Sequence, residues 1–99
     1  MAIMITHHGS DWNQDLYDRT MERVIPDPSD PPEGLMATFG GPSTGGGWKV
    51  TDIWESEADW ERFRDETLIP VAQDIQAPPF DSDMGELHYK IVTDRVTAS

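Results

Sequence analysis

The sequence predicts an α+β fold in which four strands and two helices follow one another in the order βαββαβ. Two segments carry apolar residues at helical spacing and predict helices. Four short segments are either apolar or alternate apolar with polar residues, and these predict strands. Stretches rich in proline or glycine separate several of the segments. This order is typical of a ferredoxin-like sandwich, a split βαβ unit with an antiparallel four-stranded sheet. We expect both helices to cover one face of that sheet.

The first part of the chain holds a strand, a helix and a proline-rich connector. Residues 2–8 (AIMITHH) form a short apolar run that predicts the first strand. Asp11 and Gln14 have the spacing of a helix cap and precede an apolar stripe, which predicts a helix over residues 11–25. Residues 26–34 (PDPSDPPEG) contain four prolines, which neither continue a helix nor enter the interior of a sheet.

A hairpin is predicted next. Residues 35–40 (LMATFG) alternate, with Leu35, Ala37 and Phe39 on one side, and a glycine-rich turn leads to the strand within residues 47–56 (GWKVTDIWES). The glycine-rich run does not end in GK[ST] and leads into a strand rather than a helix. We therefore exclude a phosphate-binding loop.

A helix and a last strand complete the predicted fold. The spacing of a capping box predicts a helix from Glu57 to about Ile75, interrupted at Pro70 because proline lacks a backbone N–H. A connector then covers residues 76–85. The segment ELHYKIVTD at residues 86–94 alternates apolar with polar residues and predicts the fourth strand.

Length and charge exclude several classes of function. The 99 residues predict one domain, 1–99, whose modest core would gain from a second copy, so we expect a homodimer. A net charge of −12 repels phosphate backbones and anionic lipids, so neither nucleic acid nor a membrane is an expected partner. There is no cysteine for thiolate chemistry or disulfides. The N-terminal stretch lacks the features of a signal peptide, and we expect a cytoplasmic protein.

Strand parity assigns the side chains to two faces of the predicted sheet. Within residues 47–56 every second side chain points the same way, which places Asp52 between tryptophans on an apolar face. A buried carboxylate needs a partner. We expect the first strand to run parallel to the third and antiparallel to the fourth, so that His7, Asp52 and Tyr89 meet beneath the helices. The other face is half apolar, as expected of a surface that packs against a second copy.

With this order of elements, the segment VTDIWESEADWERFRDETLIPVAQ resembles the dimeric α/β-barrel superfamily, in particular its small antibiotic-biosynthesis-monooxygenase-like members. The resemblance covers nearly the whole domain. It is carried by DIWES at the end of a strand, WERF in the following helix and the LIPVAQ interruption. Members of that superfamily include cofactor-free oxygenases, polyketide cyclases and haem-degrading enzymes, so the resemblance implies a fold more strongly than an activity.

The resemblance argues against haem degradation as the function. Trp54 matches a tryptophan that closes the third strand in haem-degrading relatives, but Gln73 stands where their haem-ligating histidine would fall. The first strand offers His7 and His8 instead of their asparagine. Because His7 matches a strand-one histidine of cofactor-free cyclases, no cofactor is expected.

Together these observations predict a site for cofactor-independent, monooxygenase-like or cyclase-like chemistry. His7 is the candidate base, Asp52 the carboxylate that orients it, and Tyr89 or Tyr17 the donor to a substrate oxygen. Aromatic residues would wall off an apolar pocket for a small aromatic or polyketide-like molecule. The candidate substrate-binding residues are Trp12, Tyr17, Phe39, Trp54, Trp60 and Phe63. The alternative is a non-catalytic binding protein, or a structural dimer in which His7 and Asp52 are a buried pair.

A metal site is not expected. His8, His88 and Glu86 share the second face in the predicted register, but they lack the spacing of known zinc motifs. His7 and His8 are adjacent, so they point to opposite faces and cannot hold one ion together. We interpret the set as a polar patch within the dimer interface.

Overall fold

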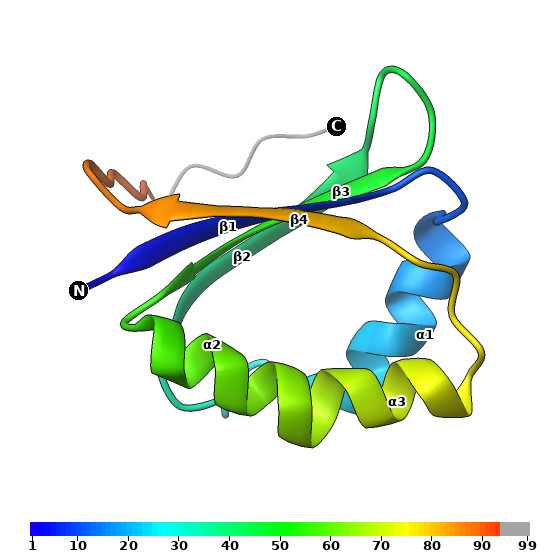
Figure 1. Cartoon of the computed structure of the whole chain (residues 1–99), viewed down its shortest axis with the longest axis horizontal. Helices are drawn as coiled ribbons and strands as arrows, with labels where there is room; N and C mark the ends of the chain where they lie inside the picture. The colour runs from blue at the N-terminus through cyan, green and yellow to red at the C-terminus, as the bar shows by residue number, and fades with distance from the viewer. Residues whose placement is uncertain (94–99) are drawn as a thin grey trace.

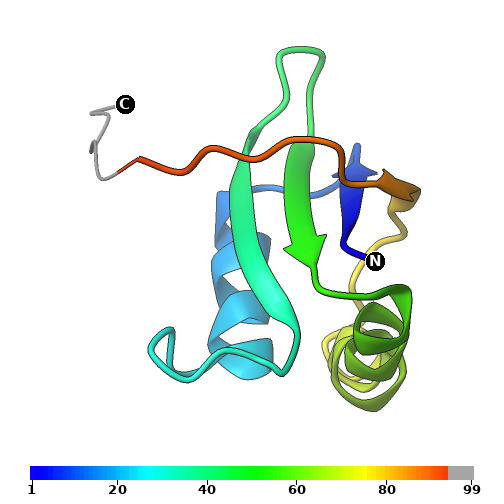
Figure 2. The ribbon, with the colours of Figure 1, turned by 90° about the vertical axis from the view of Figure 1, so that its left-hand side faces the viewer.

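The computed structural model describes residues 1–93 and contains a single four-stranded sheet within that range. In chain order its elements are β1 (Ile3–Gly9), α1 (Gln14–Val24), β2 (Leu35–Pro42), β3 (Trp48–Trp54), α2 (Glu57–Phe63), a π-helical turn (Arg64–Leu68), α3 (Ile69–Asp74) and β4 (Asp81–Glu86). The strands lie in the order β2-β3-β1-β4, and every neighbouring pair is antiparallel. Figure 1 and Figure 2 show the helices on one face of the sheet. The predicted α+β ferredoxin-like fold is confirmed.

The predicted parity of the two central strands is confirmed, but their relative direction is wrong. β1 and β3 run antiparallel, with Ile5 opposite Asp52 and His7 opposite Val50. The helical crossover through α1 brings β2 back parallel to β1, and the hairpin then reverses the chain in β3. Alternate side chains still share a face, so His7 and Asp52 are diagonal neighbours beneath the helices.

A β-bulge in β2 reverses the parity that the sequence predicts for most of that strand. Met36 has no partner in β3, and the pairing resumes at Ala37. Beyond the bulge Thr38 is opposite Asp52 and faces the helices, whereas Phe39 faces away from them and is 55% exposed. The prediction that Phe39 lines the pocket is therefore wrong, and Thr38 holds an inward position.

The fourth strand lies earlier in the chain than predicted. β4 comprises Asp81–Glu86, within the expected connector, and pairs with β1 so that Ser82 is opposite His7. All six residues are exposed, so backbone hydrogen bonds rather than an apolar face hold this edge strand. It therefore lacks the alternation by which strands are predicted. Residues 87–93 are not a strand, and residue 94 of the predicted strand lies outside the described residues.

Capping side chains start both helical segments. Asn13, rather than the predicted Asp11, caps α1, and Ser56 caps α2 as predicted; each accepts a hydrogen bond from a backbone N–H of the first turn. The predicted interruption near Pro70 takes the form of the π-helical turn before α3. Among the residues that the structure describes, no helix is long and apolar enough to cross a membrane.

The core between the sheet and the helices is rich in aromatic rings. Trp54 is fully buried, and its ring lies 5.2 Å from that of Phe63 and 6.0 Å from that of Trp60, measured between centroids. Ile3 and Ile5 of β1 complete this cluster. We call the opposite side of the sheet, which the helices leave uncovered, the open face; it carries Met4, His8, Phe39, Thr51 and Ile53.

Candidate functional site

A row of hydrogen-bonded polar side chains crosses the sheet on its helix-facing side. Ser82 Oγ lies 2.7 Å from His7 Nδ1, and His7 Nε2 lies 3.3 Å from Asp52 Oδ2. The Thr38 hydroxyl donates to Asp52 Oδ1 over 2.7 Å. The four residues belong to β4, β1, β3 and β2, the order in which the strands lie in the sheet. We call this set the polar row.

The predicted contact between His7 and Asp52 is present in the centre of the polar row. The two residues are 8% and 7% exposed. A neutral imidazole carries one N–H, so both His7 contacts are satisfied when Ser82 donates to Nδ1 and the Nε2–H donates to the carboxylate. Asp52 then accepts hydrogen bonds on both oxygens, as a buried carboxylate requires.

Tyr17 on α1 brings a phenol to this row. Burial raises the pKa of the phenol, the carboxylates of Asp52 and Asp18 raise it further, and the nearby Thr38 hydroxyl offsets part of the increase. Because burial and nearby negative charge both favour the neutral form, Tyr17 is a hydrogen-bond donor at neutral pH.

Two neighbours fix the position of the Tyr17 ring. It packs on Trp48 of β3, with 5.3 Å between ring centroids and an angle of 36° between ring planes. On β2, Gly40 leaves room for it, because a Cβ at that position would lie only 2.7 Å from the Tyr17 oxygen. The glycine is therefore required by close packing at this point.

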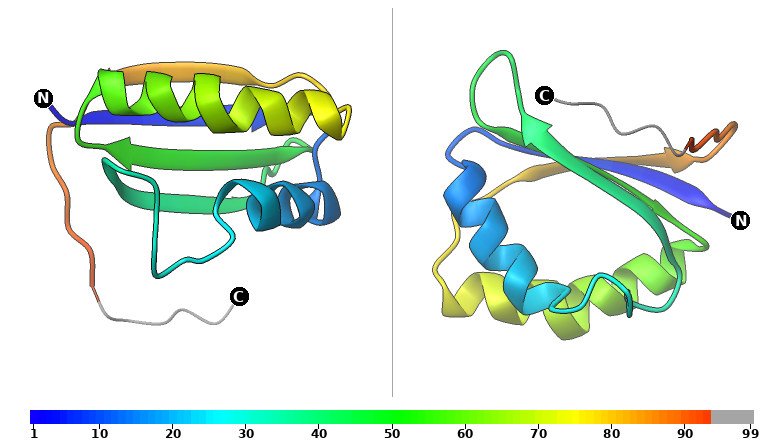
Figure 3. Two further views of the ribbon diagram at one scale, coloured as in Figure 1. Left: turned by 90° about the horizontal axis from the view of Figure 1, so that it is seen from below. Right: turned by 180° about the vertical axis from the view of Figure 1, so that it is seen from behind.

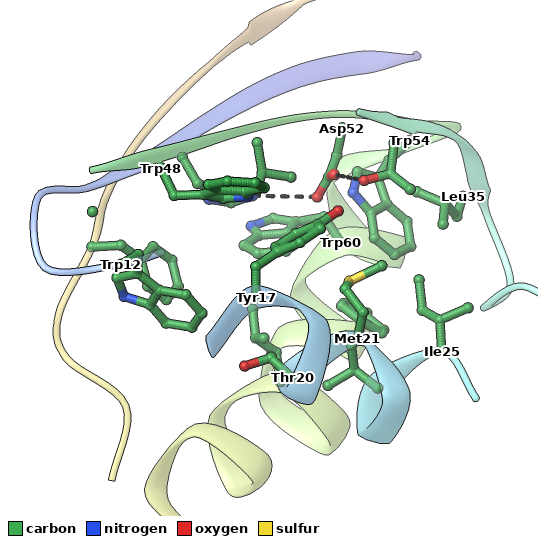
Figure 4. Close-up of a pocket in the computed structure, with 18 residues that line it drawn as sticks. Trp12, Tyr17, Thr20, Met21, Ile25, Leu35, Trp48, Asp52, Trp54 and Trp60 are labelled. Atoms are coloured by element: carbon green, nitrogen blue, oxygen red, sulfur yellow. Dashed lines mark hydrogen bonds and ion pairs between the residues drawn. The ribbon is translucent and has the colours of Figure 1, made fainter. Parts of the chain in front are cut away.

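Three residues of the polar row, His7, Asp52 and Thr38, form part of the wall of a cavity between the sheet and the helices (Figure 4). Its volume is about 90 Å³. The apolar part of the wall comes from both helical segments, the sheet and the chain before β4, and includes Trp12, Met21, Val24, Ile25, Leu35, Trp60, Phe63, Leu68 and Phe80. An empty apolar cavity of about 150 Å³ binds benzene, so this inner cavity is smaller than the space that one ring fills, and a ring would fit only if side chains moved.

Two indole N–H groups of the cavity wall are buried without a hydrogen-bond partner among the described residues. They belong to Trp48 and Trp54, which lie on either side of Asp52 in Figure 4. In contrast, the indole of Trp12 donates to the Pro78 carbonyl over 2.8 Å. A buried donor is costly unless water or a ligand oxygen accepts from it. Within residues 1–93, these two N–H groups therefore lie unpaired in residues that flank Asp52 in the cavity wall.

Most of the predicted binding residues line the cavity: Trp12, Tyr17, Trp54, Trp60 and Phe63. Tyr89 does not, because it lies beyond β4 and is 74% exposed. Its predicted position beside His7 is occupied by Ser82.

The sequence patterns do not predict three residues of the site. Thr38 reaches the row only because of the β2 bulge, and Ser82 only because β4 begins earlier than its pattern indicates. Phe80 places its ring edge-on to His7, with 5.4 Å between centroids. None of the three residues belongs to a sequence motif. The only signal in the sequence is that the proline-rich connector before β4 ends in an aromatic residue, Phe80.

The residues that the structure describes contain no group of three or more side chains placed to hold a metal ion. The predicted patch of His8, His88 and Glu86 does not form on one face. Glu86 lies opposite Ile3 and so shares the helix-facing side, and His88 lies beyond β4. The shift of the fourth strand is the cause.

Comparison with known proteins identifies the fold. No protein-family model matches the chain, and no curated protein matches its sequence. SnoaB, a cofactor-independent oxygenase from Streptomyces nogalater, matches with a TM-score of 0.61 at 9% identity, over 91% of this chain and 95% of that chain. A protein of unknown function from Nitrosomonas europaea gives 0.65 at 13% identity, over 95% of each chain.

A third structure belongs to a protein proposed to be an antibiotic biosynthesis monooxygenase from Deinococcus radiodurans. It matches with a TM-score of 0.57 at 12% identity, over 94% of this chain and 98% of that chain. Identities this low establish a shared fold. The chain therefore has the ferredoxin-like fold of antibiotic-biosynthesis-monooxygenase-like proteins.

Proposed function

We propose that this protein is a small cofactor-independent enzyme, monooxygenase-like or cyclase-like, that removes a proton from an aromatic or polyketide-like molecule. The observation that carries the proposal is the buried, hydrogen-bonded His7 and Asp52 pair in the wall of an aromatic cavity. The fold shared with a cofactor-independent oxygenase supports the same class of activity.

In this proposal His7 is the base, and Asp52 orients its ring and shares the proton. With a neutral imidazole and an ionised carboxylate the pair carries one negative charge in an apolar site. Transfer of the substrate proton to His7 leaves the net charge of the site unchanged: the imidazolium pairs with the Asp52 carboxylate, and a negative charge develops on the substrate. Tyr17 and the indole N–H groups of Trp48 and Trp54 donate to the substrate oxygen on which negative charge develops.

Two reactions can follow this proton transfer. In oxygenation, a carbanion next to an aromatic carbonyl reduces O₂: the methylene carbon gains one oxygen atom as a new carbonyl, and the other oxygen leaves as water with the two hydrogens. In cyclisation, the carbanion adds to a second carbonyl carbon of the same molecule. Both begin with the same abstraction from carbon, which is therefore the step to test.

Binding without catalysis is the second candidate function. Two observations favour it: the inner cavity is small, and both ring nitrogens of His7 already have partners in this structure. In that case His7 and Asp52 would hold the sheet together and present a polar end to a ligand.

Hydrogen–deuterium exchange of an acidic C–H separates these candidates. The probe is 4-hydroxyphenylacetone, whose methylene lies between a phenol ring and a ketone, and exchange in D₂O is followed by NMR. We expect the protein to accelerate exchange and His7→Gln, which cannot accept a proton, to reduce the rate to that of buffer. His8→Gln, the neighbouring histidine on the open face, is the matched control and retains the acceleration. A wild-type protein that binds the ketone without accelerating exchange would instead be a binding protein.

We also propose a homodimer formed through the open face. Met4, Met36 and Phe39 are large apolar residues that are 41% to 55% exposed on the strands β1 and β2. Sedimentation equilibrium tests the proposal: the wild-type chain should sediment as a dimer, and Phe39→Asp should shift it toward the monomer. A monomeric wild type at micromolar concentration would refute it.

A further inference from the structure

We propose that the ligand site continues outward from the inner cavity into a groove beneath the proline-rich segment of residues 26–34, and that it takes an elongated molecule whose distal end is uncharged or cationic. The inference rests on the proposed function for its inner end, where the ring of the ligand meets the polar row. The outer end is argued from the groove itself.

The groove lies between α1 and the proline-rich segment. It has a volume of about 470 Å³ and is lined on one side by Pro26, Pro28 and Pro31. Figure 3 shows this segment leaving the end of α1 and projecting outward before it returns to β2. Prolines fix the backbone dihedral φ, so they present a stiff apolar surface at little cost in conformational entropy on binding.

Four side chains line both the groove and the inner cavity: Met21, Ile25, Leu35 and Thr38. The two spaces are therefore adjacent and share these four side chains as part of their walls. Figure 4 shows the first three together at the side of the cavity away from Trp12. Methionine has three rotatable bonds and adapts to irregular spaces, so Met21 can move aside for a ligand.

The volumes of the two spaces favour a ligand that occupies both. An inner cavity of about 90 Å³ holds a single ring at most, whereas pockets for drug-sized molecules measure roughly 300–1,000 Å³. The groove supplies the missing volume. Its Thr38 donates to Asp52, so a molecule that extends from the groove past Thr38 arrives directly at the polar row.

The charge of the groove selects the distal end of the ligand. Asp18 and Glu22 of α1 line it, and none of its lining residues is basic. The whole chain carries a net charge of −12. This negative potential would repel a carboxylate or phosphate at the outer end of the ligand. It would not repel an uncharged group, and it would attract a cationic one.

Three phenols that differ only in their tails test the inference by titration calorimetry: phenol, 4-hexylphenol and 6-(4-hydroxyphenyl)hexanoate. Burial of one methylene strengthens binding by about fourfold. We therefore expect 4-hexylphenol to bind at least tenfold more tightly than phenol, and the carboxylate-tailed compound to lose most of that gain.

A charge reversal in the groove makes the test specific. Glu22→Arg should restore tight binding of the carboxylate-tailed compound and leave phenol unchanged. Glu61→Arg, an exposed residue of α2 outside the groove, makes the same change in net charge and should have no such effect. Equal effects of the two variants, or no gain from the hexyl tail, would overturn the inference.

The outcome is separable from that of the proposed function. Binding is measured here, whereas proton abstraction is measured by deuterium exchange with His7→Gln. Tail-dependent binding without exchange would support the groove and refute the enzyme. Exchange without tail dependence would support the enzyme and confine its ligand to the inner cavity.

Discussion

Two adjacent histidines on opposite faces of the sheet differ in burial and in hydrogen bonding. His7 is buried beneath the helices and both of its ring nitrogens have side-chain partners, Ser82 and Asp52. His8, the next residue, is exposed on the open face and contacts a single backbone carbonyl, that of Gly46. Alternate strand residues face opposite sides, so the covering helices alone create this difference. Burial forces a polar group into a fixed hydrogen-bonded geometry, which is what a functional site needs.

The largest expected effect contrasts an aromatic residue on each face. Trp54→Ala removes a fully buried indole and should lower the free energy of unfolding by about 3–5 kcal/mol. Phe39→Ala removes a ring that is largely exposed in the single chain and should cost less than about 1 kcal/mol under dilute conditions. Urea denaturation of both variants measures the two values. Similar losses would contradict the assignment of the core to the helix-facing side.

The next effect compares two threonines. Thr38→Val removes the hydroxyl that donates to the buried Asp52 carboxylate and should cost about 1.5–3 kcal/mol, because hydrogen bonds to charged groups are the strong ones. Thr51→Val is the matched control on the open face, where the hydroxyl has only a 3.4 Å contact with Thr6. We expect its cost in urea denaturation to stay within about 0.5 kcal/mol. A reversed order would show that the polar row does not stabilise the fold.

A pH dependence separates a covered tyrosine from an exposed one. The pKa of Tyr17 is raised in the folded protein above its ordinary 10.0, first by burial and then by Asp52, so the fold favours its protonated form. This contribution to stability is complete below pH 10 and is lost as the pH rises through the folded pKa. As the pH rises above 10, Tyr17→Phe should therefore lose less stability than the wild type. Tyr89→Phe, at an exposed position, should follow the wild-type curve.

The smallest effect concerns an ion pair outside the core. Arg23 and Asp74 join α1 to α3 over 2.8 Å, but their side chains are 47% and 65% exposed. Asp74→Asn should cost at most about 1 kcal/mol, and less at high salt, because exposed pairs are screened. Chemical denaturation at two salt concentrations measures this. A salt-independent loss of several kcal/mol would mean that the pair is more protected than its exposure indicates.

The sequence predicts the central strands well and the edges of the sheet poorly. In β3, Trp48 and Val50 alternate with the polar residues Lys49 and Thr51, as expected of a strand that the helices cover on one face, and this alternation made the strand predictable although Asp52, Ile53 and Trp54 are all buried. β4 has no buried residue, and its register is set by backbone pairing with β1, which leaves no trace in side-chain hydropathy. The β2 bulge at Met36 likewise arises from pairing. Half of the polar row, His7 and Asp52, was therefore predictable, whereas Thr38 and Ser82 were not.

The polar row draws one residue from every strand, and this has a consequence for how the protein can fail. A slip of any strand by a single position would turn its member of the row to the far side and break the chain of hydrogen bonds there. No fragment that lacks a strand could hold all four groups in place. The proposed proton abstraction by His7 would therefore require a correctly assembled sheet. It would be present when all four strands are in register and lost when any one of them is displaced.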